Sequence, residues 1–179
     1  MQAFQAIISN AIPLDMDNVD TDMIIPAQFL TKIEKSGYGK HLFQRLKEQN
    51  PKFILNNSKY QFSKILLARA NFGCGSSREH AVWALLQSGM KAIIAESFSD
   101  IFLNNASKNG LLTISLSPQT INNLMRQAQQ ETYILSIDLS KQIIVTSANE
   151  IFKFEYDSFR KDCLLRGQDD LDYLLEITQ

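Results

Sequence analysis

A continuous apolar run, Ile65-Leu66-Leu67-Ala68, is the feature that most constrains how this chain can fold. Runs of this kind are typical of strands that are covered on both faces, as in parallel sheets. A second such run lies at 92–95, and the segment 111–116 is interpreted as a third strand. The intervening segments, 79–88 and 98–108, carry apolar residues at helical spacing. This alternation of strand and helix predicts βαβ units and therefore parallel strands.

The remaining segments predict a mixed fold around that centre. No Pro-, Gly- or Ser-rich linker divides the chain, so we expect one α/β or α+β domain over residues 1–179. Gly167 is expected to separate the last two helices. The further elements that we expect are strands at 4–9 and 151–156, a short strand and turn at 22–30, a hairpin of 132–138 with 142–147, and helices at 41–48, 119–130, 157–166 and 169–177.

Composition and charge exclude several classes of function. The chain has 179 residues, 18 basic and 19 acidic side chains, and a net charge of −1. Such a balance offers no electrostatic footprint for nucleic acid. No apolar run approaches the roughly 20 residues of a membrane span, and the N-terminus lacks the basic region of a signal peptide. We therefore expect a cytoplasmic protein with no nucleic-acid or membrane partner.

The cysteine content bears on metal chemistry. The chain has two cysteines, Cys74 and Cys163, and neither belongs to a Cys-x-x-Cys pair. Zinc and iron–sulfur sites need more ligands of this kind than the chain supplies. We therefore expect no metal and no cofactor bound by this chain alone. Low cysteine usage also suits a reducing compartment.

The strongest candidate site is Gly73-Cys74-Gly75-Ser76-Ser77-Arg78-Glu79-His80, which follows a predicted strand and opens a predicted helix. Glycines at such a turn let the backbone approach a ligand closely. The first N–H groups of a helix lack internal partners, and together with the helix dipole they form an anion site. Ser76 and Ser77 add hydroxyl donors, and Arg78 adds a guanidinium suited to a carboxylate or phosphate.

A purely structural interpretation explains part of this segment. Ser76 and Glu79 have the spacing of a capping box, in which each side chain satisfies a backbone donor, but a cap does not require two glycines, a second serine and an arginine. The segment is neither a P-loop nor a Gly-x-Ser-x-Gly nucleophile elbow. His80 is expected to orient or pack rather than to activate a nucleophilic serine. His41 is expected to lie on a surface helix.

The acidic segment from Asp15 to Asp22 is a second candidate. It is not an EF-hand loop, because Asp20 stands where that loop needs glycine and no glutamate closes it. Asp15 and Asp20 are interpreted as solvated carboxylates. Asp22 borders the apolar run 23–26, so we expect its carboxylate to be partly buried and paired, as functional carboxylates often are.

The segment 28–39 is a third candidate, because it combines lysines, glycines and apolar residues. Such a loop is usually a mobile, solvated surface. The same composition would also suit a lid over an acid with an apolar tail.

Four stretches of the chain carry a resemblance to a known family. They lie at 17–26, 71–81, 95–112 and 159–172, and the run Gly-Ser-Ser-Arg-Glu-His in the second is specific in this context. Together they resemble the small subunits of 3-isopropylmalate dehydratase, in the aconitase superfamily. The resemblance covers essentially the whole chain.

This resemblance implies a swivelling β/β/α domain that docks on a large subunit carrying a [4Fe–4S] cluster. The implied reaction is a hydro-lyase reaction of leucine biosynthesis, in which 2-isopropylmalate loses water and regains it to give 3-isopropylmalate. The enzyme would be active only with both subunits.

The resemblance also implies roles for individual residues. Ser76 corresponds to the base that takes the carbon-bound proton, and Gly75, Ser77 and Arg78 correspond to ligands of a substrate carboxylate. Asp22 matches an acidic residue that pairs with a catalytic histidine of the large subunit.

The loop at 29–39 corresponds to the region in which the superfamily separates its substrates, with Leu30, Lys32 and Lys35 as candidates. Aconitase-like members carry a substrate-binding arginine in this region, and this loop has none. Other interpretations stay open: a related small subunit acting on citramalate or homocitrate, a non-catalytic anion-binding module and, less well supported, a serine hydrolase.

Overall fold

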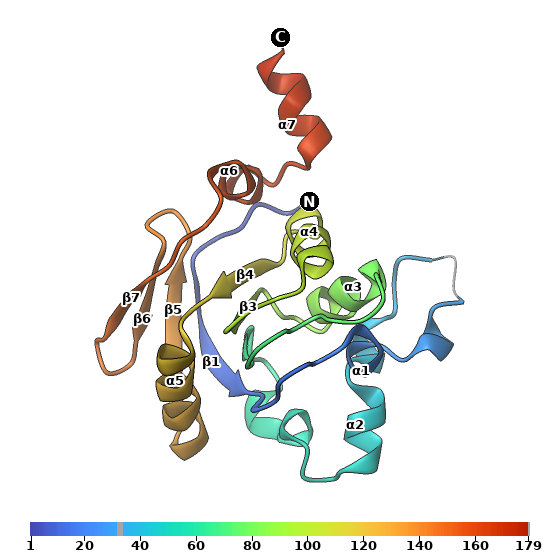
Figure 1. The fold of residues 1–179 in the computed structure, drawn as a ribbon, viewed down its shortest axis with the longest axis vertical. Helices are drawn as coiled ribbons and strands as arrows, with labels where there is room; N and C mark the ends of the chain where they lie inside the picture. Colours follow the sequence, from blue (N-terminus) through green and yellow to red (C-terminus); the bar gives the residue numbers. More distant parts are fainter. Residues whose placement is uncertain (32–33, 179) are drawn as a thin grey trace.

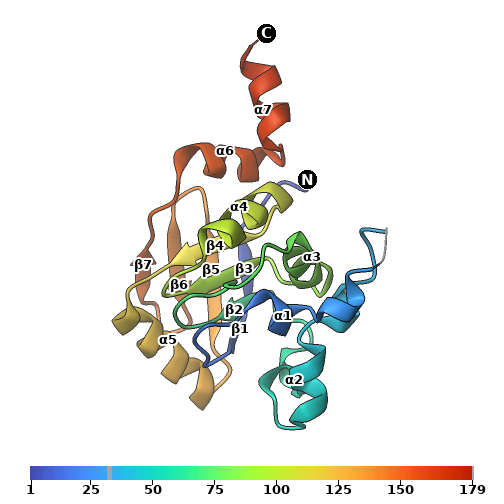
Figure 2. The ribbon, with the colours of Figure 1, turned by 45° about the vertical axis from the view of Figure 1, so that its right-hand side comes forward.

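Strand β1 joins the two halves of one sheet. The computed structural model describes residues 1–31 and 34–178 (Figure 1), and within them the strand order is β4-β3-β2-β1-β5-β6-β7 (Figure 2). The second half of β1 pairs in parallel with β2, and its first half pairs antiparallel with β5. The strands are β1 (Ile7–Pro13), β2 (Ile65–Leu67), β3 (Ala92–Ala95), β4 (Leu112–Ser115), β5 (Ile134–Asp138), β6 (Ile143–Thr146) and β7 (Ile151–Lys153).

The parallel half of the sheet confirms the βαβ prediction. Strands β2, β3 and β4 lie side by side and run parallel. Every residue of β2 and β3 is 0% exposed, as continuous apolar runs predict for strands covered on both faces. Helices α3 (Glu79–Gln87) and α4 (Asp100–Asn109) cover one face, and α5 (Pro118–Gln130) covers the other (Figure 1 and Figure 2).

Two apolar cores lie on opposite faces of the sheet because side chains alternate along each strand. Leu66 and Ile93 belong to the core that includes α3 and α4. Ile65 and Ile94 belong to the core that includes α5. A shift of one residue in strand register would exchange the two sets of side chains, so burial on both faces fixes the register. The packed sheet thereby positions the segment that leaves the carboxyl end of β2.

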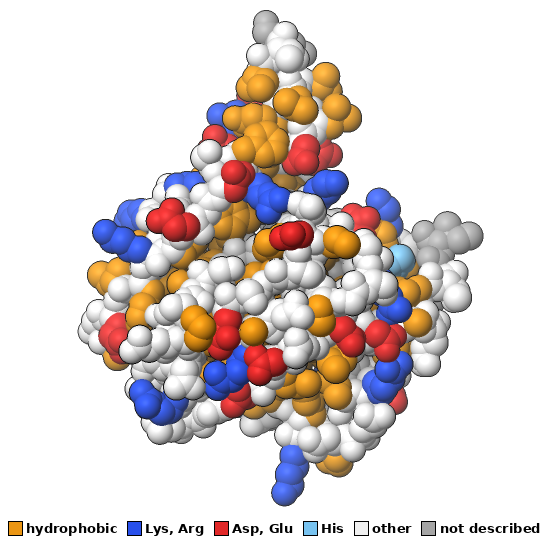
Figure 3. Space-filling view, viewed as in Figure 1, with side chains coloured by type: hydrophobic (Ala, Val, Ile, Leu, Met, Phe, Trp, Pro, Cys, Tyr) orange, Lys and Arg blue, Asp and Glu red, His pale blue; other side chains and the backbone are white. Residues whose placement is uncertain are grey.

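The antiparallel half confirms the predicted hairpin, since β5 pairs with β6 and β6 pairs with β7. Beyond it, α6 (Ser158–Arg166) ends at Gly167, as predicted, and this glycine has φ +70°. Helix α7 (Asp170–Ile177) then projects from the body of the molecule, and Figure 3 shows apolar side chains gathered on this projection. Its exposed apolar residues are Leu171, Leu174, Leu175 and Ile177.

The prediction of a strand and turn at 22–30 is wrong. The chain there forms helix α1 (Thr21–Ile24), followed by a 3-10 turn, Ala27–Phe29. Asp20 is the N-cap of α1, and its carboxylate accepts a hydrogen bond of 2.7 Å from the backbone N–H of Met23. This capping bond favours a helical start over an extended strand.

Helix α2 (Gln44–Gln49) begins later than the helix predicted at 41–48. Phe43 precedes it with φ +51°, a left-handed conformation that does not occur inside a regular helix. His41 closes a separate 3-10 turn, Gly39–His41. Two further 3-10 turns are Ile54–Asn56 and Ser58–Tyr60. Among the described residues, no helix combines the length and the apolar character needed to cross a membrane.

Candidate functional site

Residues 73–80, here called the glycine segment, connect the carboxyl end of β2 with the first turn of α3. The backbone has φ +76° at Gly73 and +90° at Gly75. At Gly73 space also requires glycine, because a Cβ there would lie 2.3 Å from Cγ of Phe102. At Gly75 a Cβ would have room, so the positive φ is what favours glycine. This path leaves the two serines that follow exposed to solvent.

The glycine segment is tied to the acidic motif of the N-terminal region. Gly73 donates its backbone N–H to the carbonyl of Val19 at 2.7 Å, and Thr21 donates its N–H to the carbonyl of Cys74 at 3.0 Å. The hydroxyl of Thr21 donates to the carbonyl of Ser76 at 2.9 Å. The structure therefore brings together two motifs that are separate in the sequence.

Backbone donors without acceptors distinguish this segment. From Gly75 to His80, no backbone N–H donates a hydrogen bond to another described residue. Ser77 lies within this row, and its side chain is exposed. Helix α3 begins at Glu79, with Arg78 as an N-cap that makes no side-chain capping bond. A row of free donors at the positive end of a helix dipole is an arrangement that binds anions.

The predicted capping box between Ser76 and Glu79 does not form. The N-cap is Arg78, and the carboxylate of Glu79 accepts a hydrogen bond of 2.9 Å from the side-chain amide of Asn109. Ser76 lies three residues before the helix, where its exposed hydroxyl has no hydrogen-bond partner among the described residues. The interpretation of Ser76 as a cap is therefore wrong, and its hydroxyl is accessible to a ligand.

Asp22 lies between two arginines. Its Oδ1 accepts a hydrogen bond from Nη1 of Arg78 at 3.1 Å, and its Oδ2 accepts one from Nη1 of Arg45 at 2.8 Å. Oδ1 also accepts from the backbone N–H of Ala27 at 3.2 Å. The hydrogen bonds from Arg45 and Arg78, in that order, lower the pKa of Asp22 from 3.8 to about 2. The expectation that Asp22 is paired is confirmed, and its carboxylate is ionised at neutral pH.

Arg78 is held firmly while keeping donors for a ligand. Its side chain is 18% exposed. Besides its bond to Asp22, Nη1 donates to the carbonyl of Ile25 at 3.4 Å. The remaining N–H groups of the guanidinium make no hydrogen bond to a described residue.

Sequence reasoning missed Arg45. This arginine lies on α2, 23 positions after Asp22, and reaches it because α1 and α2 are in contact. Nothing in the pattern around position 45 distinguishes it from arginines on other helix surfaces. Its ion pair is a tertiary feature with no local sequence signal.

Asp15 is exposed, as expected for a solvated carboxylate, whereas Asp20 is half-buried, and both make contacts that the sequence interpretation did not include. Asp20 caps α1, and Asp15 forms an ion pair with Arg69. Asp15 also accepts a hydrogen bond of 3.1 Å from the side-chain amide of Gln129. The hydrogen bond from Arg69 lowers the pKa of Asp15. Both carboxylates hold the connection between β1 and α1, which presents Asp22.

The candidate specificity residues of the segment 28–39 that the structure describes make different contacts. Leu30 is half-buried and packs against the core that includes α3. The ammonium of Lys35 lies 5.5 Å from the centre of the Trp83 ring, one turn into α3. Lys32 lies outside the described residues. Lys35 therefore lies beside Trp83 of α3 and not beside Glu79, the residue at which α3 begins.

Both histidine rings take part in aromatic packing. The ring of His80 lies 5.3 Å from that of Tyr38 and 4.8 Å from that of Trp83, which agrees with the expectation that His80 packs. His41 stacks on Phe29 with ring centroids 3.8 Å apart, so it is not a simple surface helix residue.

The two thiols of this chain do not fit an iron–sulfur cluster. Cys74 lies in the glycine segment and Cys163 is buried on α6, and both are free. Burial raises the pKa of each thiol. A cluster needs several thiolates close together. In the described part of the chain, no three His, Cys, Asp or Glu side chains gather where they could hold a metal ion.

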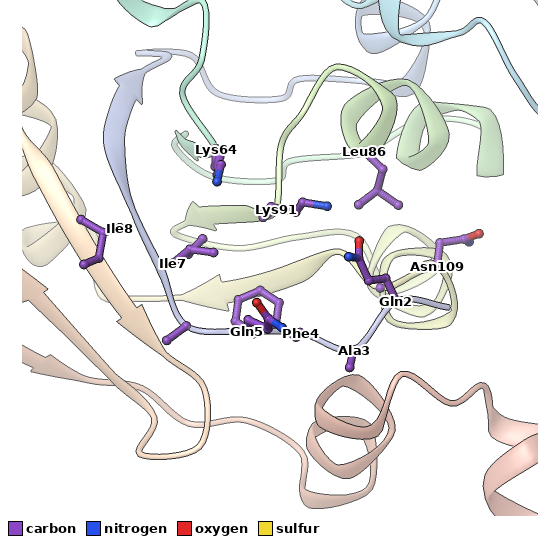
Figure 4. A pocket seen from close by; sticks show the side chains of 12 residues that line it. Gln2, Ala3, Phe4, Gln5, Ile7, Ile8, Lys64, Leu86, Lys91 and Asn109 are labelled. Atoms are coloured by element: carbon purple, nitrogen blue, oxygen red, sulfur yellow. The ribbon is translucent and has the colours of Figure 1, made fainter.

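A cavity of about 430 Å³ lies at the other end of the strands (Figure 4). Lys64 and Lys91, which precede β2 and β3, border it together with Phe4 and other N-terminal residues. No residue of the glycine segment lines this cavity. The candidate site is instead an exposed surface at the carboxyl end of β2.

Comparisons with known proteins agree with this geometry. The family described as "Aconitase C-terminal domain" matches residues 1–119. A protein named 3-isopropylmalate dehydratase small subunit, from Francisella tularensis subsp. novicida, is 57% identical over 176 residues, covering 98% of this chain and 93% of the relative. A protein of the same name from Marinobacter nauticus is 46% identical over 191 aligned residues, covering 98% and 89%.

A solved structure shares the fold. The crystal structure of 3-isopropylmalate dehydratase from Methanocaldococcus jannaschii is similar to this chain with a TM-score of 0.73 and 31% identity. The match covers 97% of this chain and 96% of that one. The predicted fold class, an α/β swivelling domain of the aconitase type, is confirmed.

Proposed function

Since this chain belongs to the small-subunit family of 3-isopropylmalate dehydratase, we propose that its glycine segment forms one half of an active site for isopropylmalate. As a member of that family it is one subunit of a hydro-lyase of leucine biosynthesis, and a large subunit is its partner. The reaction removes water from 2-isopropylmalate and returns it in the other sense to give 3-isopropylmalate. The names of the relatives do not favour citramalate, homocitrate or a non-catalytic module.

The observation that carries the proposal is the row of free backbone donors beside Arg78. Isopropylmalate is a dicarboxylate, and free N–H groups at a helix start suit a carboxylate, as does a guanidinium. We assign carboxylate binding to Gly75, Ser77 and Arg78. Because Asp22 holds Arg78, the guanidinium meets the substrate in one orientation.

Ser76 is the proposed base. In dehydration its oxygen takes a proton from the carbon next to the one whose hydroxyl leaves as water. In rehydration it gives a proton to the carbon that lost the hydroxyl, while the oxygen of water adds to the carbon that lost the proton. A serine hydroxyl is a weak base at neutral pH, so its alkoxide needs positive potential nearby. The N-terminus of α3 and the guanidinium of Arg78 supply that potential, and an interface that excludes water strengthens it. The hydrogen bond from Thr21 fixes the backbone of Ser76.

Asp22 and the specificity loop complete the proposed half-site. Asp22 holds Arg78 within this chain, and by resemblance it also pairs with a catalytic histidine of the large subunit. The loop residues proposed to select the substrate are Leu30, Lys32 and Lys35. Leu30 offers apolar surface, and the loop carries no arginine for a third carboxylate.

The large subunit is proposed to carry the [4Fe–4S] cluster, because the thiols of this chain do not fit one. The cluster supplies an iron that binds the substrate hydroxyl. This chain contributes anion binding, orientation and proton transfer. The exposure of Ser76 and Ser77 leaves the half-site open to such a partner.

The proposal extends to the whole of residues 1–179 as one swivel domain, acting in the cytoplasm. One sheet runs through both halves of the fold. The free cysteines fit a reducing compartment.

Reconstitution tests the proposal. Dehydration of 2-isopropylmalate is measured with the chain alone and after addition of an iron–sulfur large subunit. We expect turnover only when both are present, and turnover of citramalate and homocitrate well below that of isopropylmalate. Robust activity of the chain alone would contradict the half-site.

Ser76→Ala separates a base from a simple ligand. We expect kcat in the complex to fall by about 10²–10⁴-fold, the range for a general base, with KM little changed. Ser140→Ala, in the exposed turn between β5 and β6, is the matched control. A mere anion ligand would lose about 1 kcal/mol of affinity, or roughly fivefold, with kcat preserved.

A further inference from the structure

We propose that Arg45 is a positioning residue of this site, which acts through the Asp22 carboxylate to orient the guanidinium of Arg78. The inference rests on the proposed function, in which Arg78 binds a substrate carboxylate. It adds a residue of α2 to a half-site otherwise built from the N-terminal motif and the glycine segment.

One carboxylate bridges the two guanidinium groups. Oδ2 of Asp22 is bound by Arg45 at 2.8 Å, while Oδ1 is bound by Arg78 at 3.1 Å and by the backbone of Ala27 at 3.2 Å. The terminal torsion of an aspartate is broad. With Arg45 removed, Oδ2 has no described partner and the carboxylate is free to turn. Arg78 then loses a fixed acceptor.

The fold places Arg45 by a constrained backbone rather than by a flexible arm. Phe43, two residues earlier, is left-handed with φ +51°, which is a genuine outlier for a bulky side chain. Its ring is 0% exposed, and its N–H donates to the carbonyl of Ile24 at 2.9 Å. These contacts join the start of α2 to the end of α1, which lie side by side in Figure 1 and Figure 2. Strain of this kind persists where the surroundings over-determine the conformation, and it is often found at functional sites.

The charges around the carboxylate support the assignment. The guanidinium groups of Arg45 and Arg78 share the single carboxylate of Asp22. These three side chains together therefore keep a net positive charge beside the free donors of the glycine segment. Arg45 is the first cause of the lowered pKa of Asp22. The side chain of Arg45 is 48% exposed, so its replacement removes little packing.

Arg45→Gln in the reconstituted complex is the first test. We expect KM for isopropylmalate to rise by about tenfold, as for the loss of a charge-assisted contact, while kcat changes less. Arg45→Lys keeps the charge and is expected to restore most of the loss. Arg166→Gln is the matched control, because it breaks an exposed arginine–carboxylate pair of 3.3 Å between α6 and α7. An unchanged KM in Arg45→Gln overturns the proposal.

A double-mutant cycle separates positioning from direct binding. If Arg45 acts through Asp22, Arg45→Gln has no further effect on KM in an Asp22→Asn background. An equal rise in both backgrounds overturns the proposal, because Arg45 would then act directly on the substrate.

A measurement on the isolated full chain keeps the inference distinct from the proposed function. Carbon-13 NMR of the Asp22 carboxyl should show its pKa rising from about 2 toward 3.8 in Arg45→Gln, and the Nη1–H group of Arg78 that is bound to Asp22 should exchange faster with solvent. Unchanged Arg78 exchange overturns the inference. Absence of isopropylmalate turnover in the wild-type complex would overturn the proposed function while leaving this result standing.

Discussion

The hydroxyl of Thr21 donates a hydrogen bond of 2.9 Å to the carbonyl oxygen of Ser76. The two residues are 55 positions apart, and the bond joins the acidic motif to the proposed base. Thr21 is 3% exposed, so water does not replace the bond easily. The N-terminal motif therefore contributes to the position of Ser76 as well as supplying Asp22.

Thr21→Val should reduce activity more than stability. The change keeps the side-chain shape and removes the donor, which should cost about 1 kcal/mol in the free energy of unfolding. Because Ser76 then loses a fixed backbone, kcat of the reconstituted complex should fall by about tenfold or more. Urea unfolding and turnover measure the two effects. Thr21→Ser keeps the hydroxyl and is the control; an equal fall of kcat in both variants would argue against the bond.

Gly73→Ala should be far more destabilising than Gly37→Ala. The two glycines have similar positive φ, +76° and +82°, so both changes carry the left-handed penalty of about 1–2 kcal/mol. At Gly73 a Cβ would lie 2.3 Å from Cγ of Phe102, whereas at Gly37 it meets nothing within 4 Å. Overpacking should add about 1–3 kcal/mol at Gly73 alone. Equal unfolding midpoints of the two variants in urea would contradict the close packing of Phe102 against Gly73.

The ion pairs of Asp22 should stabilise the fold in a pH-dependent manner. Its pKa is lowered from 3.8 to about 2, so its contribution is complete above pH 3.8 and is lost as the pH falls through about 2. Because the Asp22 side chain is 37% exposed, we expect its ion pairs to contribute only about 1 kcal/mol to the free energy of unfolding. Unfolding of wild type and Asp22→Asn is compared from neutral pH downward. The difference between their free energies of unfolding should be constant at first and should decrease below pH 3.8. A difference that stays constant there would contradict the assignment.

Helix α7 should be dispensable for the stability of the body. No α7 residue is buried, and its contacts with α6 include an exposed ion pair of Arg166 with Glu176 and a ring contact of Phe159 with Tyr173. Truncation after Gln168 should lower the thermal midpoint by no more than about 4 °C, which corresponds to about 1 kcal/mol. Truncation before α6 is the control and should be strongly destabilising, because Leu164 is 0% exposed. Similar losses in both truncations would contradict the projecting position of α7.

Local patterns were sufficient for the central fold and for the position of the candidate site within it. The apolar runs of β2 and β3 predicted buried parallel strands, and the glycine segment was correctly placed between a strand and a helix. At 22–30 the apolar pattern was misleading, because Asp20 caps the segment that follows it and stabilises a helix there. The capping-box pattern of Ser76 and Glu79 was misleading too, because Asn109 provides a tertiary partner.

The sequence by itself determined the central alternation of strands and helices, the position of the glycine segment and the family, because these depend on local periodicity and on residues adjacent in the chain. Only the tertiary structure decided what each polar group binds. Arg45 meets Asp22 because α1 packs against α2, and Thr21 meets Ser76 because β1 lies beside β2. Such pairs carry no local signal, since their geometry depends on the packing of elements distant in the sequence.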